Sequence, residues 1–541
     1  MRTRLLASWV WPTLLWTSCQ RPETSAVTTA PRTTPEHTAY ERTSSVADVQ
    51  RFLFELNGLP CGNRLHVEVA GRSHEDREIL LVRAALPGID ESKALRALVI
   101  ANIHAGEVEG KESVQAILRE IALGEHADLL ARFVLYFVPV YNVDGNERID
   151  VKNRPEQNGP AAVGQRANAQ GLDLNRDFVK AEAPETRALL ALFQRLDPHL
   201  FFDLHTTDGS WHDYDLTYAP SLSTNCDDGV AALSRTLLEA ASSRLEDAER
   251  PFHTFDYGNF ETRDWDGGGA PSSQAEVRGF WTYDHRARYG VNYFGLRNRI
   301  GILSEAYSNA DFETRIEATR AFVLAVLREA GHREDSLRAA FHWADSMSDG
   351  GSLDPATDVL ESVTFGFDTV FAKPESLALR IGDCDRLPWP DGRGVRFARK
   401  PSTAVEVLPV FRRFESKTQV RLPRAWVVPN PPPAATELLQ RHGIEFEVLT
   451  EARTEPAATF AVTKKRKPKR PFQGHQELVL EGDYGDPELT MLPVGSLWID
   501  GCQRLARLAA TLLEPQSEDS LSTWNYFEAV TADRYPVLRL H

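Results

Sequence analysis

Residues 97–107 have the sequence Ala97-Leu98-Val99-Ile100-Ala101-Asn102-Ile103-His104-Ala105-Gly106-Glu107. The first seven are mostly apolar and β-branched, which predicts a strand buried on both faces. Gly106 and Gly110 then interrupt the pattern, and a helical spacing of apolar residues begins at Val114. His104 and Glu107 therefore lie in a turn at the carboxyl end of a strand, where α/β folds place their ligands.

The same alternation of buried strand and helix continues on both sides of this stretch. Apolar runs predict strands at 65–69, 79–85, 133–140, 200–205 and 300–304, and helical spacing predicts helices at 47–56, 184–196, 229–244 and 314–330. This order predicts an α/β fold, with a mixed, mainly parallel sheet and helices on both faces, over residues 46–335.

The texture of the chain changes after a Ser-, Asp- and Gly-rich break near residues 346–354. Short strand-like runs at 376–381, 404–407 and 425–428 lie between Pro and Gly residues, with helical spacing only at 435–442 and 503–513. We therefore expect a second, mostly β accessory domain over residues 355–541.

Composition excludes several classes of protein. The chain has 541 residues, of which 42% are hydrophobic and 26% charged, as in an ordinary globular protein. Its formal net charge of −16 makes a nucleic-acid partner unexpected, because phosphate binding needs a basic surface. We expect the one basic run to be a solvated loop, with an interaction site as the alternative; its sequence is Lys464-Lys465-Arg466-Lys467-Pro468-Lys469-Arg470. No later segment has the length and apolarity of a membrane span.

The amino terminus has the layout of an export signal. Arg2 and Arg4 precede an apolar run, and Thr17-Ser18-Cys19 resembles a bacterial lipoprotein cleavage site, at which Cys19 would be lipidated. We expect a signal over residues 1–19 and a flexible Pro- and Thr-rich tether over 20–45. Export without lipidation and an uncut terminal anchor remain alternatives.

Export would place the remaining cysteines in an oxidising environment. Cys61, Cys226, Cys384 and Cys502 are even in number but widely scattered, so the sequence selects neither a disulfide pairing nor free thiols.

Two further strand ends carry residues suited to metal or acid–base chemistry. His205 ends the run at 200–205, and Glu305 follows the run at 300–304. His104, Glu107 and His205 make a donor set that suits a catalytic zinc ion and leaves a fourth position open for water. Glu305 would then be the general base that takes a proton from that water.

The long polar loop from 142 to 178 supplies candidate substrate-binding groups. It begins with the turn Asn142-Val143-Asp144-Gly145 and contains Arg154 and the pair Asn175-Arg176. An arginine fork matches both oxygens of a carboxylate, and a second arginine near a metal can stabilise the oxyanion formed when water adds to a carbonyl.

With these motifs in this order, the sequence resembles the zinc carboxypeptidase family of the carboxypeptidase A type, over roughly residues 50–335. The resemblance implies one zinc ion held by His104, Glu107 and His205, and Glu305 as the general base. It implies that Arg154 polarises the scissile carbonyl and that Asn175 and Arg176 hold the terminal carboxylate of a peptide.

Two more residues follow from the resemblance. Asp173 matches the family's acid that orients the first zinc histidine, a role with a clear physical reason. The position of the family's substrate-contacting tyrosine corresponds best to Tyr283, and Tyr289 and Tyr293 are alternatives for the same role.

The spacing from His205 to Glu305 is longer than is usual in the family, so the loops around 208–290 are expected to be enlarged. Within them Asp208, His212, Asp213 and Asp215 would either shape a pocket for polar or basic side chains or be solvated loop residues.

These observations predict an exported, membrane-tethered zinc metallocarboxypeptidase whose partner is a peptide with a free carboxy-terminal carboxylate. One alternative is a zinc-dependent deacylase of small N-acyl amino acids, because Asp203-Leu204-His205-Thr206-Thr207 resembles the metal-binding segment of aspartoacylase-like enzymes. The other is a non-catalytic surface protein that binds peptides through a degenerate site.

Overall fold

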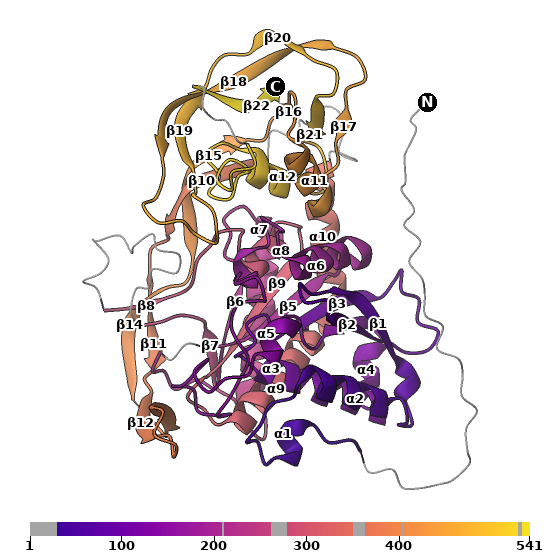
Figure 1. Ribbon diagram of the computed structural model, residues 1–541, viewed down its shortest axis with the longest axis vertical. Helices are drawn as coiled ribbons and strands as arrows, with labels where there is room; N and C mark the ends of the chain where they lie inside the picture. The colour runs from indigo at the N-terminus through magenta and orange to yellow at the C-terminus, as the bar shows by residue number, and fades with distance from the viewer. Residues whose placement is uncertain are drawn as a thin grey trace.

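A computed structural model describes residues 30–207, 210–260, 278–349, 363–402, 404–527 and 533–540 (Figure 1). The signal with Cys19, the tether as far as residue 29, Asp208, and residues 350–354 of the predicted break lie outside these ranges. Across the described ranges, no helix combines the length and apolarity that crossing a bilayer requires.

The catalytic part is built on one eight-stranded sheet. Its strands are β1 (Leu65–Arg72), β2 (Glu78–Ala84), β3 (Leu95–Ala101), β4 (Phe133–Val138), β5 (Leu200–Thr206), β6 (Leu216–Pro220), β7 (Thr254–Asp256) and β9 (Ile300–Ala306). Their order is β1-β2-β4-β3-β5-β9-β6-β7. The central strands β4, β3, β5 and β9 are parallel, whereas β1, β2 and β6 pair antiparallel with their neighbours towards the centre. This confirms the predicted mixed, mainly parallel sheet.

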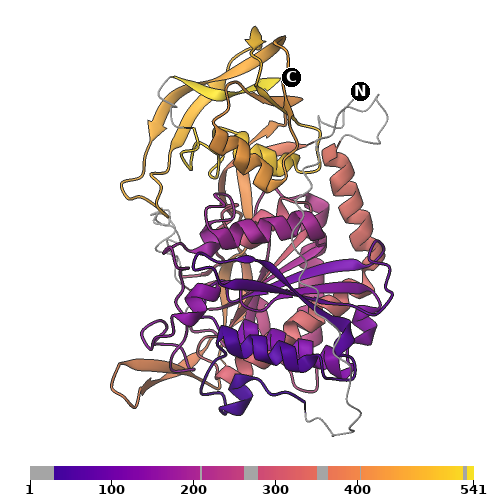
Figure 2. The same ribbon diagram turned by 45° about the vertical axis from the view of Figure 1, so that its right-hand side comes forward.

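Helices cover both faces of the sheet, as predicted. They are α1 (Thr34–His37), α2 (Val46–Leu56), α3 (Glu109–Leu123), α4 (Ala127–Leu130), α5 (Val143–Glu147), α6 (Pro184–Leu196), α7 (Asp228–Glu246), α8 (Gly290–Gly295), α9 (Phe312–His332) and α10 (Glu334–Asp349), with short 3-10 turns η1 (Gly62–Arg64) and η2 (Leu174–Arg176). Figure 2 shows the sheet between α6 on one side and α2 on the other. With both faces covered, β4 and β5 are buried along their whole length, which explains their continuous apolar runs.

The carboxy-terminal part is β-rich, which confirms the second predicted domain type. Its strands are β10 (Thr364–Phe371), β11 (Glu375–Arg380), β12 (Asp383–Pro388), β13 (Val395–Lys400), β14 (Val405–Phe411), β15 (Phe414–Arg421), β16 (Ala425–Val428), β17 (Glu447–Val448), β18 (Arg453–Arg466), β19 (Val479–Tyr484), β20 (Glu488–Leu492), β21 (Leu497–Asp500) and β22 (Arg534–Leu540), with helices α11 (Pro433–His442) and α12 (Ala506–Leu513). The largest sheet is antiparallel, in the order β17-β21-β16-β22-β18-β19 with β20 beside β18.

The two parts share one hydrophobic core. A single cluster of buried apolar side chains includes Val99 of β3 and Trp426 of β16. A strand inside the catalytic sequence, β8 (Phe280–Trp281), pairs with β14 of the second part. The accessory part is therefore packed on the catalytic part rather than linked to it loosely. Cys61, Cys226 and Cys384 are free thiols within the described chain.

Two predicted boundaries need correction. Residues 30–45, predicted as tether, pack on the catalytic part, because the buried Glu112 carboxylate accepts hydrogen bonds from Thr43 Oγ1 and Ser44 N–H, both at 2.8 Å. Their polar composition suggested a solvated segment, but two of their polar groups form hydrogen bonds to a buried carboxylate. At the other end, α10 extends the helical region beyond residue 335 and packs against α7 and α12.

Candidate active site

Three strand ends meet at one edge of the sheet. β5 lies between β3 and β9, with Ala101 matched to Leu204 and His205 matched to Glu305. Matched residues in neighbouring strands lie about 5 Å apart. The sheet therefore brings the separate sequence motifs into one site.

The turn after β3 holds His104 and Glu107 in place. The Glu107 N–H donates to the His104 carbonyl at 2.9 Å, and Asn102 Nδ2 donates to the Glu107 carbonyl at 3.2 Å. A Cβ on Gly106 would lie 2.9 Å from Arg154 Cδ and 3.1 Å from the Gly164 carbonyl oxygen. Glycine at this position lets the turn approach the long loop closely.

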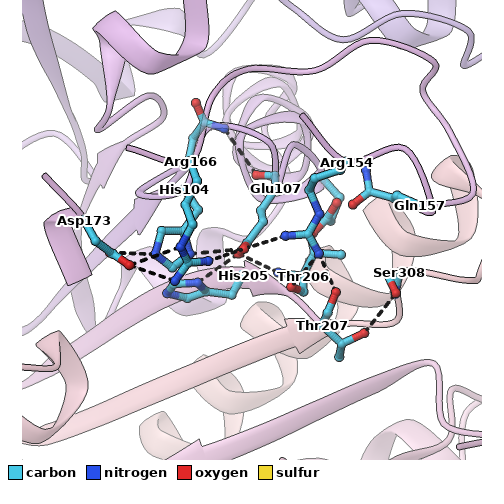
Figure 3. Close-up of polar contacts among 12 residues, drawn as sticks. His104, Glu107, Arg154, Gln157, Arg166, Asp173, His205, Thr206, Thr207 and Ser308 are labelled. Atoms are coloured by element: carbon cyan, nitrogen blue, oxygen red, sulfur yellow. Dashed lines mark hydrogen bonds and ion pairs between the residues drawn. The ribbon is translucent and has the colours of Figure 1, made fainter. Parts of the chain in front are cut away.

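His104, Glu107 and His205 converge as a metal-type cluster (Figure 3). His104 Nδ1 lies 3.1 Å from Glu107 Oε1, and His205 Nδ1 lies 2.9 Å from Glu107 Oε2. One donor atom from each residue falls within 4.8 Å of the other two, and all three residues are buried. Burial raises the pKa of Glu107, but the neighbouring His104 and Arg154 charges outweigh it and hold that pKa well below its usual range.

Asp173 is hydrogen-bonded to the far nitrogen of His104, and Asp203 lies within ion-pair distance of the far nitrogen of His205. His104 Nε2 lies 3.0 Å from Asp173 Oδ1, as predicted, and His205 Nε2 lies 3.0 Å from Asp203 Oδ2. Carboxylates in this position fix the ring orientation and direct the opposite nitrogen to a metal. Two imidazole nitrogens together with the Glu107 carboxylate fit zinc and leave a coordination position open.

The cluster opens into a cleft that contains most of the predicted site residues. The cleft is lined by His104, Glu107, Arg166, Asn175, Arg176, His205, Thr206, Tyr257, Tyr283, Tyr289, Val291, Leu303 and Glu305. The predicted zinc ligands, the predicted base and the predicted clamp residues all line it, whereas Arg154 and Asp173 do not.

Asn175 and Arg176 are held in a rigid setting on η2. The Gly290 N–H donates to Asn175 Oδ1 at 2.9 Å, and the Arg176 guanidinium lies over the Tyr289 ring at 3.9 Å. An arginine stacked in this way keeps its planar fork oriented for a carboxylate.

The three candidate tyrosines separate in the structure. Tyr283 and Tyr289 line the cleft, whereas Tyr293 is buried and bonds His442. The Tyr283 hydroxyl donates to Asn292 Oδ1 at 3.2 Å, and burial raises its pKa well above the usual range, so it stays protonated.

Arg154, predicted to polarise the scissile carbonyl, is not among the residues that line the cleft. Its Nη1 donates to Glu107 Oε1 at 2.8 Å, and its Nη2 donates to the Thr207 carbonyl at 2.5 Å (Figure 3). These bonds hold the Arg154 guanidinium against the carboxylate of the proposed ligand Glu107.

Arg166, which sequence reasoning missed, lies in the cleft instead. Its Nη2 donates to Asp173 Oδ2 at 2.9 Å, and its Nη1 lies 3.5 Å from Glu107 Oε1. Its side chain is 52% exposed, so a bound substrate can reach it. The only sequence signal was its place in the same loop, seven residues before Asp173.

The acidic loop after His205 neither lines a specificity pocket nor is solvated, which were the two possibilities considered from sequence. His212, Asp213 and Asp215 are buried, and the two aspartates pair with Arg399 of the accessory part. Tyr257, from the same enlarged region, lines the cleft, and no sequence pattern pointed to it.

Comparison with known proteins agrees with this geometry. Residues 58–295 match the family profile described as zinc carboxypeptidase. Residues 58–295 therefore have the sequence pattern of the zinc carboxypeptidase family. The matched region contains His104, Glu107 and His205, which form the zinc-binding cluster of a zinc metallocarboxypeptidase. It ends before Glu305, so the evidence for that residue is its position in the sheet.

Two relatives of this zinc carboxypeptidase are themselves named as carboxypeptidases. Carboxypeptidase 2 of Trichophyton rubrum is 24% identical over 477 residues, which cover 83% of this chain and 77% of that protein. Carboxypeptidase Z of Homo sapiens is 33% identical over 125 residues, which cover 22% of this chain and 19% of that protein.

Two solved structures to which part of this chain is similar are metallo-carboxypeptidases. A metallo-carboxypeptidase from Burkholderia cenocepacia is 18% identical with a TM-score of 0.40, covering 53% of this chain and 69% of that one. A metallo-carboxypeptidase from Pseudomonas aeruginosa is 20% identical with a TM-score of 0.39, covering 55% of this chain and 70% of that one.

Proposed function

We propose that this zinc metallocarboxypeptidase releases carboxy-terminal residues from peptides, with Glu305 as general base and Asn175 and Arg176 as the clamp for the terminal carboxylate. The observation that supports this proposal is one cleft that contains the His104–Glu107–His205 cluster, Glu305 and the Asn175–Arg176 pair. A metal site, a base and a carboxylate-binding pair are the parts that hydrolysis of a terminal peptide bond requires.

His104, Glu107 and His205 would hold the zinc ion, which when bound supplies Lewis-acid polarisation and lowers the pKa of a water. Glu305 takes a proton from the attacking water and returns it to the leaving amine. Glu305 is matched to His205 in the neighbouring strand β5, and this register supports the assignment.

Asn175 and Arg176 bind the terminal carboxylate and thereby select the end of a peptide. The arginine fork donates to both carboxylate oxygens, and the Asn175 side chain contributes a further polar contact. A peptide with an amidated terminus lacks the charge that this pair recognises.

Arg166 stabilises the oxyanion that forms as water adds to the carbonyl, a role that the sequence had suggested for Arg154. Support comes from its place in the cleft beside Glu107 and from its partial exposure. Tyr283, protonated and in the same cleft, donates a hydrogen bond to the substrate backbone in place of the one to Asn292 Oδ1.

The proposed location is outside the cytoplasm, with a lipid anchor at Cys19. Arg2, Arg4, the apolar run and Thr17-Ser18-Cys19 support it. Mass spectrometry of the amino-terminal peptide tests it: a diacylglyceryl-modified Cys19 is expected, and an intact residue 1 or an unmodified Cys19 would contradict it.

One experiment tests the catalytic proposal. Zinc content is measured per chain, and the same preparation is given a panel of peptides with free and amidated carboxy termini. One zinc with cleavage of free termini only is the expected result. Zinc with turnover of N-acyl amino acids but of no peptide would favour the deacylase, and zinc without any turnover would favour a binding protein.

A further inference from the structure

The basic run of the accessory part, Lys464 to Arg470, has no role in the catalytic proposal. Six of its seven residues are cationic in a chain with a net charge of −16, and all seven are exposed. It begins as the end of β18 rather than as the predicted loop. Lys464 pairs with Glu481 at 2.9 Å. Within the described ranges, Arg466, Lys467, Lys469 and Arg470 have no carboxylate partner.

The loop that follows this run is fixed to the catalytic part. Gln473 Oε1 accepts a hydrogen bond from the Asp173 N–H at 3.0 Å, and His475 Nε2 lies 2.7 Å from Glu182 Oε1. Gln476 donates its side-chain N–H to the Pro468 carbonyl, which ties the basic run back to the anchored segment. The position of the run relative to the cleft is therefore set by the structure.

The anchoring contact lies next to residues of the cleft. Asp173, the partner of Gln473, also bonds His104 and precedes the clamp residues Asn175 and Arg176. Gln473 follows Arg470 by three residues, which span at most about 11 Å even when fully extended. Arg470, the last cation of the run, therefore lies within about 11 Å of Gln473, the residue that contacts Asp173.

Two carboxylates that contact or belong to the anchored segment have partners other than the run. Glu182 pairs with His475, and Glu477 pairs with the buried Arg288 at 2.9 Å. The run consequently presents uncompensated positive charge, on a protein whose overall charge repels anions.

We propose that the basic run is an extended subsite that binds acidic side chains of the peptide, upstream of the bond that is cleaved. The inference rests on the proposed function, because Asn175 and Arg176 place the peptide terminus inside the cleft and the preceding residues must leave over its rim. An extended peptide advances about 3.3 Å per residue, so the cations meet side chains roughly three to six residues before the terminus. Charge complementarity of this kind strengthens encounter and selects among substrates.

The test compares peptides that share their last two residues and carry four Glu, four Gln or four Lys immediately upstream, all with free termini. At low salt the wild-type protein is expected to show a KM about tenfold lower for the Glu peptide than for the Gln peptide, with a similar kcat. About 0.5 M salt should remove most of this preference, because exposed charges are screened.

The variant Lys467→Glu/Lys469→Glu/Arg470→Glu is expected to lose the preference and to cleave the Gln peptide at the wild-type rate. Its matched control is Arg235→Glu/Lys373→Glu/Arg386→Glu, which changes three exposed cations on other elements and produces the same change in net charge. The control should keep the preference. A wild type without the preference, a basic-run variant that keeps it or a control that loses it would overturn the proposal.

A second measurement separates this proposal from the catalytic one. A fluorescein-labelled Glu-rich peptide with an amidated terminus is titrated by anisotropy, so that neither cleavage nor the carboxylate clamp contributes. About tenfold weaker binding by the basic-run variant supports the subsite, even if no peptide is hydrolysed. Equal binding of the peptide by wild type and variant overturns the proposal. It is also overturned if neither protein prefers the Glu-rich peptide and only the wild type binds phosphatidylglycerol vesicles.

Discussion

His205 and Glu305 are matched residues of the neighbouring parallel strands β5 and β9. The proposed zinc ligand and the proposed base are therefore positioned by the backbone hydrogen bonds of the sheet, not by a loop. Asp203 lies two residues before His205 on the same strand face, which places the supporting carboxylate in the same rigid frame. Because Glu305 lies outside the His104–Glu107–His205 cluster, proton transfer and metal binding are separable by mutation.

Glu305→Gln tests the role of the base. Glutamine has the shape of glutamate but cannot accept the proton, so we expect zinc to be retained and turnover to fall by about 10²- to 10⁴-fold. Metal content by mass spectrometry and hydrolysis of a free-terminus peptide check both parts. Activity within tenfold of the wild type would refute the assignment.

His205→Ala should give the complementary result. It removes one of three metal donors and leaves Asp203 and Glu107 as buried carboxylates without their imidazole partner. We expect loss of zinc after dialysis together with loss of activity, and a lower midpoint of thermal unfolding. A protein that keeps stoichiometric zinc would show that the ligand set is different.

Arg166→Ala is expected to impair turnover, whereas Arg154→Ala is expected to impair zinc binding. Arg166 faces the cleft, so its loss is expected to lower kcat by about 10²- to 10³-fold while zinc affinity changes little. Arg154 donates to Glu107, so its loss is expected to weaken zinc binding, with activity restored by added zinc. Zinc affinity by chelator competition and kcat at saturating zinc distinguish the two, and the reverse pattern would return the oxyanion role to Arg154.

Asp203→Asn tests the second carboxylate–histidine pair. The amide keeps the size of the side chain but loses the charge that orients His205, so zinc affinity should fall by about 10- to 100-fold. The same competition assay measures it, with Asp173→Asn as the matched change behind His104. Unchanged affinity in the Asp203 variant would mean that β5 alone orients the ring.

The sequence predicted the parts of this protein in which local pattern and burial agree. Strands β3, β5 and β9 are covered on both faces, so their residues are mostly apolar, and His104, His205 and Glu305 lie at or just beyond their carboxyl ends. The α6 helix begins at Pro184 and ends at Leu196, as its spacing predicted, because proline at the first helical position and the apolar stripe are both local signals.

The rest depended on contacts between distant residues. Nothing near Arg154 or Arg166 indicates which guanidinium turns to the cleft, since that depends on where Thr207 and Asp173 lie in the fold. Asp213 and Asp215 have the composition of a solvated loop, yet Arg399, more than 180 residues away, makes them buried ion pairs. Gln473 gave no signal of its contact with Asp173 for the same reason.

The contact between His475 and Glu182 predicts a pH-dependent stability of the two-part structure. The hydrogen bond to Glu182 raises the pKa of His475 above its usual 6.5, and although burial raises the pKa of Glu182, the bond to His475 helps to lower it below 4.5. The pair therefore stabilises the fold from above the usual carboxylate range to the raised histidine pKa, and the contribution disappears as the pH rises through that value.

His475→Gln should consequently destabilise the protein by about 0.5–1 kcal/mol near pH 5.5, and much less near pH 9, where the wild-type imidazole is neutral. Denaturant unfolding of wild type and variant at both pH values measures the difference. Glu182→Gln, the matched change on the catalytic side, should remove the same pH-dependent part, and the double variant should lose little more than either single one. An equal loss at both pH values would mean that His475 contributes packing and not charge.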